Sequence, residues 1–104
     1  MDIESKKSAL RKYRVLLSKI ARLKNMISLC PENTERYSRE INTCTAARDK
    51  IEQAIEAVDG DILTEILSLK YMCGKTIEEI SLDICYSRRH TERMHQKGLT
   101  LIKI

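Results

Sequence analysis

The chain has 104 residues and a mass of 12.0 kDa, which suits one small domain and excludes the doubly wound sheets and barrels of many larger enzymes. One proline, three glycines, no Phe and no Trp leave few turns and few strand formers, so the composition excludes an all-β fold and favours helices. The net charge of +4 is divided into two basic ends and an acidic middle, because eight Lys or Arg against two acids occupy residues 1–30 and five against one occupy residues 85–104.

Residues 3–30 have the spacing of one long amphipathic helix. Apolar side chains recur every three or four positions and most flanking positions are Lys or Arg, so one face is apolar and the rest is basic. The basic face either binds phosphate directly or is a solvated face, and we expect the solvated face. The apolar positions are Leu10, Tyr13, Leu17, Ile20 and Ile27, with Leu16, Leu23 and Cys30 beside them. Pro31 should end this helix, since the residue before a proline is displaced from the α region.

A second amphipathic helix is predicted up to residue 58, with Asn33 or Thr34 as its cap. Its apolar positions are Tyr37, Ile41, Cys44, Ile51, Ile55 and Val58, interrupted at Arg48. The short connection predicts an antiparallel, coiled-coil-like hairpin. Because two helices bury too little core to be stable alone, this hairpin should pack on the C-terminal half, on a second copy of the chain or on another protein.

The sequence Asp59-Gly60-Asp61 is expected to separate a hairpin domain, residues 1–58, from a second domain, residues 59–104. Gly60 suits the end of one helix and Asp61 suits the cap of the next, a helix over 62–72 that Gly74 should end. Thr76 and Glu79 form a capping box that opens a helix over 77–84. A turn over 85–87 then leads to a third helix over 88–103.

A short helix, a tight turn and a longer helix form the layout of a helix-turn-helix, so we expect an all-α chain with this domain after the hairpin. The start of the last helix carries side chains that read base edges, since Arg bonds guanine, Glu accepts from cytosine and Gln pairs with adenine. The predicted DNA-binding residues are Ser87, Arg88, Arg89, Glu92, Arg93, Gln96 and Lys97. Ser87 should cap the helix, and the lysines, Lys103 included, should meet phosphates.

The segments 62–72, 74–81 and 86–95 resemble region 4 of the sigma-70 family. That family combines a leucine-rich helix, a G-x-T/S-x-x-E-I-A element and a helix of the form S-x-x-x-V-x-x-x-x-x-x-A-L. The chain departs from the pattern at Ser81, Thr91 and Gly98, which replace Ala, Val and Ala. Thr91 brings a hydroxyl towards the core, and Gly98 should loosen the last helix by about 0.5–1 kcal/mol relative to Ala.

With its basic N-terminal hairpin, the whole chain is similar to phage transcriptional regulators of the ArpU and RinA type. The resemblance implies a sequence-specific regulator that binds double-stranded promoter DNA, contacts RNA polymerase and controls late genes of a phage or prophage. The alternative is a helical adaptor, anti-sigma-like or polymerase-binding, that docks protein and does not bind DNA. The apolar stripes of the hairpin fit a homodimer or a hairpin packed on itself, and we expect the dimer because two-fold proteins read two half-sites.

No catalytic or metal site is expected. The chain has no Gly-rich phosphate loop and no H-E-x-x-H motif, so we predict no enzyme activity and no cofactor. The cysteines never pair as C-x-x-C and should be buried and reduced. Cys73, Cys85, His90 and His95 lack the spacing of a zinc site, and the two histidines should meet phosphate or water at the DNA surface.

The chain shows no sign of membrane association. No apolar run approaches the roughly 20 residues that span a bilayer. The N-terminus does not combine a basic segment with an apolar core, as an export signal would. We therefore expect a cytoplasmic protein of a bacterium or of a phage-infected host cell.

Overall fold

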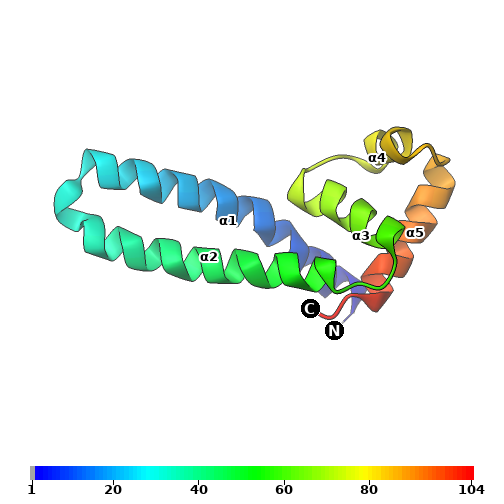
Figure 1. Cartoon of the computed structure of the whole chain (residues 1–104), viewed down its shortest axis with the longest axis horizontal. Coiled ribbons are helices and arrows are strands. Elements are labelled where there is room, and N and C mark those ends of the chain that lie inside the picture. Colours follow the sequence, from blue (N-terminus) through cyan, green and yellow to red (C-terminus); the bar gives the residue numbers. More distant parts are fainter. Residues whose placement is uncertain (1) are drawn as a thin grey trace.

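The computed structural model describes residues 2–104 and is all-α, as predicted. Two long antiparallel helices form a hairpin, and three shorter helices pack at its open end, where both termini lie (Figure 1). The hairpin helices are α1 (Ile3–Leu29) and α2 (Thr34–Glu56), and the shorter ones are α3 (Asp61–Leu67), α4 (Ile77–Ile84) and α5 (Arg88–Leu101). The molecule measures 52 × 27 × 21 Å. None of the helices over residues 2–104 is long and apolar enough to cross a membrane.

The hairpin turn differs in detail from the prediction. Pro31 follows the end of α1, as expected, but it opens a one-turn 3-10 helix, Pro31–Asn33. No side chain caps α2, because Asn33 lies in this turn and the Thr34 hydroxyl donates instead to the Pro31 carbonyl, at 2.6 Å. Asn33 does hold the N-cap position of α2, as predicted, but its side chain makes no capping hydrogen bond, and Thr34 is the first residue of the helix. Asp2 does cap α1, accepting from the Ser5 amide at 2.8 Å.

The distal half of the hairpin has a small core of its own. Ile20 and Leu23 of α1 pack with Tyr37 and Cys44 of α2, and all four are buried. Leu17, which the spacing predicted as part of the same face, is instead 38% exposed, while its neighbour Leu16 packs against the core. The 3.6-residue period places Leu16 and Ile20 on one face, and Leu17 lies about 100° further round.

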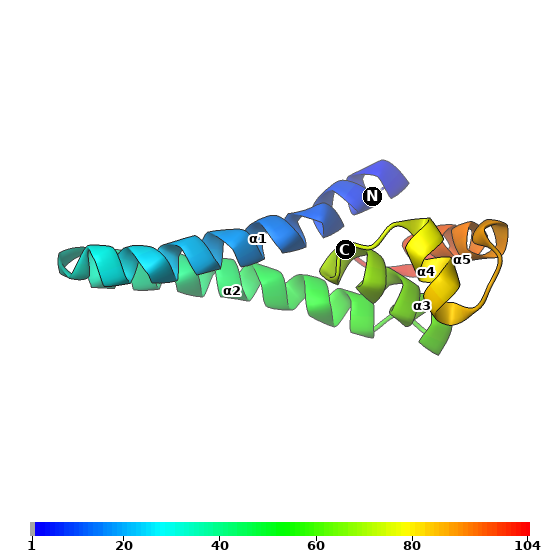
Figure 2. The same ribbon diagram turned by 90° about the horizontal axis from the view of Figure 1, so that it is seen from above.

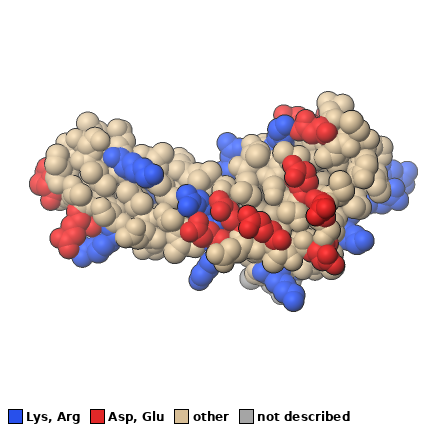
Figure 3. Space-filling model, viewed as in Figure 1, with Lys and Arg blue, Asp and Glu red and all other residues tan. Residues whose placement is uncertain are grey.

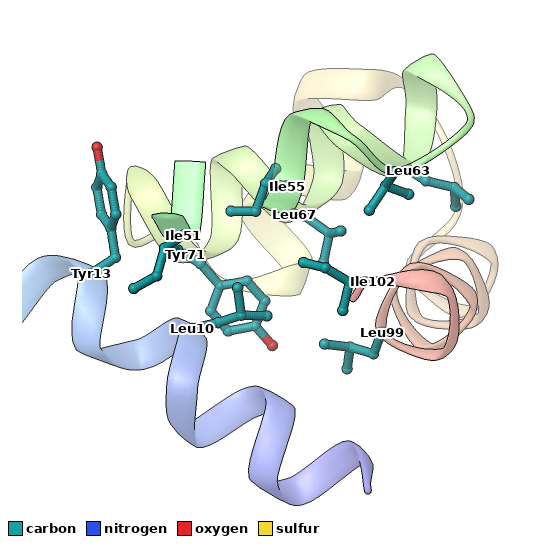
Figure 4. Packing of buried hydrophobic residues seen from close by; sticks show 10 residues of the cluster. Leu10, Tyr13, Ile51, Ile55, Leu63, Leu67, Tyr71, Leu99 and Ile102 are labelled. Carbon is teal, nitrogen blue, oxygen red and sulfur yellow. The ribbon is translucent and has the colours of Figure 1, made fainter. Parts of the chain in front are cut away.

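A larger core at the base joins the hairpin to the other helices. Leu10 of α1, Ile55 of α2, Leu67 of α3 and Leu99 of α5 are completely buried in one cluster (Figure 4). The first turns of α1 diverge from α2, and the shorter helices pack there (Figure 2). Of the three packing partners considered for the hairpin, the C-terminal half of the chain is therefore the one that the structure shows.

Lysine 6 makes a second connection between the two ends of the chain. Its Nζ donates to the backbone carbonyls of Leu99 and Thr100, at 2.9 and 3.2 Å. Carbonyls in the last turn of a helix have no partner within the helix, and a cation also suits the negative end of the helix dipole. A side chain of α1 thus provides hydrogen bonds for two carbonyls at the C-terminal end of α5.

The helix predicted over 62–72 is not regular. After α3 the backbone widens into a π-helical segment, Ser68–Met72, in which the Cys73 amide donates to the Ser68 carbonyl at 3.1 Å. Gly60 precedes α3 without a side-chain cap, and Asp61 is its first residue, so the roles predicted for both were wrong. Gly74 has a φ of +75°, and the Arg14 guanidinium of α1 lies against it. The ending at Gly74 is confirmed, since this left-handed conformation favours glycine.

A shared basal core predicts that the hairpin and the C-terminal helices unfold together. Leu10→Ala should lower the free energy of unfolding by about 2–5 kcal/mol, because it leaves a cavity between all these helices. Chemical denaturation followed by helical circular dichroism should still show one transition. The control Leu17→Ala, at an exposed position on the same helix, should change stability by about 0.5 kcal/mol or less. A Leu10→Ala variant that loses the hairpin in a separate early transition would contradict the shared core.

Candidate nucleic-acid interface

The turn between α4 and α5 is built as the local sequence predicts. The Thr76 hydroxyl accepts from the Glu79 amide, and Glu79 Oε1 accepts in return from the Thr76 amide, at 3.2 and 3.1 Å. Cys85 then takes a left-handed conformation, with φ of 60°, and ends α4. Ser87 Oγ accepts from the His90 amide at 3.1 Å and caps α5. The capping box, the bounds of α4 and the Ser87 cap are confirmed, and α5 ends at Leu101, two residues early.

One face of α5 is buried and fixes the helix on the core. Thr91 is completely buried, and its hydroxyl donates to the Ser87 carbonyl at 2.9 Å, so the polar group is satisfied within the helix. Gly98 lies against Leu67, where an added Cβ would be 3.2 Å from Leu67 Cδ1. Glycine therefore serves a close approach of α5 to α3. Leu99 and Ile102 are buried in the core, whereas Leu101 is 45% exposed.

The other face of α5 is exposed and carries the predicted site. The side chains that are exposed together around its first turns are Ser87, Arg88, Arg89, Glu92, Arg93, Gln96 and Lys97. Arg88 Nε lies 3.9 Å from Glu92 Oε1, and this exposed pair contributes little to stability. Basic side chains project where α4 meets α5, whereas acidic ones gather over the middle of the molecule on the same view (Figure 3). The site is thus basic and open to solvent.

A groove of about 780 Å³ runs beside this face. Its α5 wall includes Arg89, Glu92, Arg93 and Gln96, while Arg88 and Lys97 lie outside it. The opposite wall brings residues that the sequence did not assign to a site, Lys7 and Arg11 of α1 and Lys70 of the π-helical segment. The sequence placed Lys7 and Arg11 on the basic face of the first helix, but only the packing of α1 on the C-terminal helices brings these cations beside α5.

His95 lies at the floor of the groove and is not available at the surface. It is 5% exposed, and its Nε2 lies 2.8 Å from the Tyr71 hydroxyl, with which it is hydrogen-bonded. Burial, helped by the charges of Lys70 and Lys7, lowers the pKa of His95 to about 4. Burial also raises the pKa of Tyr71 to about 12. The expectation that His95 meets DNA was therefore wrong, because its helix position faces the core.

His90 and the cysteines complete the set considered for metal. His90 is half-buried and packs against the Tyr86 ring, with centroids 4.9 Å apart. Cys44 is buried, as predicted, but Cys73 and Cys85 are exposed because each lies at the end of a helix, next to a turn. Over residues 2–104, no three His, Cys, Asp or Glu side chains come together in a way that could hold a metal ion.

Comparison of the chain with protein-family models, with curated proteins and with solved structures finds no match in any of the three. The chemistry of the α5 face and the groove therefore carries the functional argument. That chemistry consists of guanidinium, amide and carboxylate groups on one exposed helix, with further cations facing them. The guanidinium, ammonium and amide groups can donate to phosphates and base edges, and the Glu92 carboxylate can accept from cytosine.

The buried His95 predicts a specific loss of stability in acid. Its pKa is lowered on folding, so the unfolded chain binds the proton more tightly, and stability is lost as the pH falls from about 6.5 to about 4. The loss should be about 3 kcal/mol and should be measured by urea denaturation across this range. His95→Gln should remove this component, whereas the control His90→Gln should retain it. Parallel pH profiles for the wild type and His95→Gln would show that His95 is not buried and neutral.

Proposed function

We propose that the protein is a sequence-specific, double-stranded DNA-binding transcriptional regulator that uses α4, the turn and α5 as a helix-turn-helix. The observation that carries the proposal is the exposed polar face at the capped start of α5. In a helix-turn-helix the N-terminal residues of the second helix contact base edges in the major groove. The buried face of α5 packs closely on α3. The opposite face is therefore exposed and available to enter the major groove of DNA.

Each side chain of this face has a chemical role in the proposal. Arg89 and Arg93 bond guanine through two nitrogens, Glu92 accepts from cytosine and Gln96 pairs with adenine. Arg88, beside Glu92, reads bases at the edge of the site. Ser87 and Lys97 contact phosphates, which position the protein without specifying sequence. The helix N-terminus adds a favourable field for a phosphate near Ser87.

The biological setting of the proposal rests on resemblance. The segments like sigma-70 region 4 support binding at a promoter with contact to RNA polymerase, and the hairpin supports a phage regulator of late genes in a bacterial cytoplasm. Homodimerisation stays a prediction. Tyr13, Ile20, Tyr37 and Ile51, whose stripe suggested it, are buried within one chain, so a second copy would have to bind other side chains.

An observation also favours the rival proposal of a protein-docking adaptor. Leu82 of α4 is 75% exposed, and Tyr86, in the turn that leads into α5, is 38% exposed. Exposed apolar side chains of this kind are typical of protein contacts. The two functions differ in their response to salt, because binding through several phosphates weakens steeply between 50 and 200 mM salt and an apolar contact does not.

Base readout by α5 predicts a sequence-dependent loss in arginine variants. Selection of bound oligonucleotides by the purified protein would first define a preferred site. Arg89→Ala or Arg93→Ala should then weaken binding to that site by about 1–3 kcal/mol and relax the preference at one base position. Fluorescence anisotropy with the preferred duplex and single-base variants measures both effects. The control Lys50→Ala, exposed on α2, should bind like the wild type. Unchanged binding by both arginine variants would refute the assignment of α5 as the recognition helix.

A further inference from the structure

The first turns of α1 lie beside the proposed recognition helix, although they are the most distant part of the sequence. Two contacts hold them there. Leu10 is completely buried in the basal core, and Lys6 donates to the carbonyls of Leu99 and Thr100. Lys7 and Arg11 are four residues apart and therefore share a face of α1, and both line the groove.

The groove has a strong excess of positive charge. Its walls carry five cations and one carboxylate, that of Glu92. The cations are Lys7, Arg11, Lys70, Arg89 and Arg93. Over residues 2–104 the ion pairs of the structure engage only one of these cations, in a contact of 3.5 Å between Lys7 Nζ and Glu4 Oε1.

The cations on the α1 side affect one another. Burial lowers the pKa of Lys70, and the charges of Arg11 and Lys7 lower it further. Like charges held together by packing repel, and they attract an anion that neutralises them. The arrangement is fixed by the core, so this repulsion is not relieved by moving α1 away. The groove is therefore ready to receive anionic groups without rearrangement.

We propose that Lys7 and Arg11 of α1, together with Lys70, bind the phosphate backbone of the same DNA whose bases α5 contacts. This inference rests on the proposed function. The major groove is about 12 Å wide and is bordered by two phosphate strands, so a helix inside it has phosphates on both sides. Lys7, Arg11 and Lys70 line the same groove as Arg89, Arg93 and Gln96 of α5. When α5 enters the major groove of DNA, these cations would therefore lie near one of the two phosphate strands. The hairpin thus positions the recognition helix.

The proposal separates two kinds of contact that one experiment distinguishes. Phosphate contacts change affinity for every sequence and the dependence on salt, whereas base contacts change the preference among sequences. The test variant is Lys7→Gln/Arg11→Gln. The matched control, Lys19→Gln/Lys24→Gln, removes the same charge from exposed positions of α1 that lie outside the groove. Circular dichroism melting would establish that both variants keep the wild-type fold.

Binding to the preferred duplex and to an unrelated duplex is measured by anisotropy from 50 to 200 mM salt. The Lys7→Gln/Arg11→Gln variant should weaken binding to both duplexes by the same factor, at least about tenfold, and lower the slope of log K against log salt by about 2. Its preference for the selected site should not change. The Lys19→Gln/Lys24→Gln control should keep a slope close to that of the wild type.

Several outcomes would overturn the proposal. Equal effects of the two double variants would mean that α1 acts only through its total charge. If the Lys7→Gln/Arg11→Gln variant binds DNA with the affinity and salt slope of the wild type, α1 does not contact DNA and α5 alone is the DNA site. Failure of the wild-type protein to bind any duplex would refute the proposed function and this inference together. Inorganic pyrophosphate that stabilises the wild type but not the variant, in a protein that binds no DNA, would assign the groove to a small anion.

Discussion

The basal core is the constraint on which the rest of the structure depends. Leu10, Ile55, Leu67 and Leu99 come from four different helices and are all removed from water. Each buried side chain of this size contributes about 1.5–3 kcal/mol relative to an exposed one, so no pair of helices could be separated without a large loss. The same cluster sets the direction of α1, since the first turns of this helix must diverge from α2 to reach α5. The groove beside α5 is a consequence of that divergence.

The two faces of α5 differ in role: the residues of one face pack in the core, and those of the other are exposed to solvent. Its buried polar groups are satisfied nearby, Thr91 by the Ser87 carbonyl and His95 by the Tyr71 hydroxyl. No side-chain nitrogen or oxygen that is fully buried within residues 2–104 lacks a partner. A helix held by satisfied contacts has little freedom to rotate, so its exposed arginines are presented in one register. Such preorganisation lowers the entropy lost when a partner is bound.

Local signals in the sequence predicted the parts of the fold that local interactions determine. The capping box at Thr76, the cap at Ser87 and the bounds of α4 follow from hydrogen bonds between residues three apart, and the structure has all of them. Other features depend on residues far apart in the chain. The widened turn over Ser68–Met72 and the burial of His95 arise where α1 packs on the C-terminal helices, and no spacing rule carries that information. The exposed residues of the candidate site followed from sequence, but their neighbours on α1 did not.

The charge of the first 30 residues illustrates why tertiary placement decides what a basic segment does. Counted along the chain, its eight Lys and Arg look equivalent and resemble the solvated face of any amphipathic helix. In the fold they have different partners. Lys6 completes the end of α5, Arg14 lies against the turn at Gly74, and Lys7 and Arg11 face a groove with few acidic groups. The cations near the base of the hairpin have specific structural surroundings, whereas those towards its tip, such as Lys19 and Lys24, are simply exposed. The part of this charge that we propose to bind DNA is therefore the part that the basal core holds beside α5.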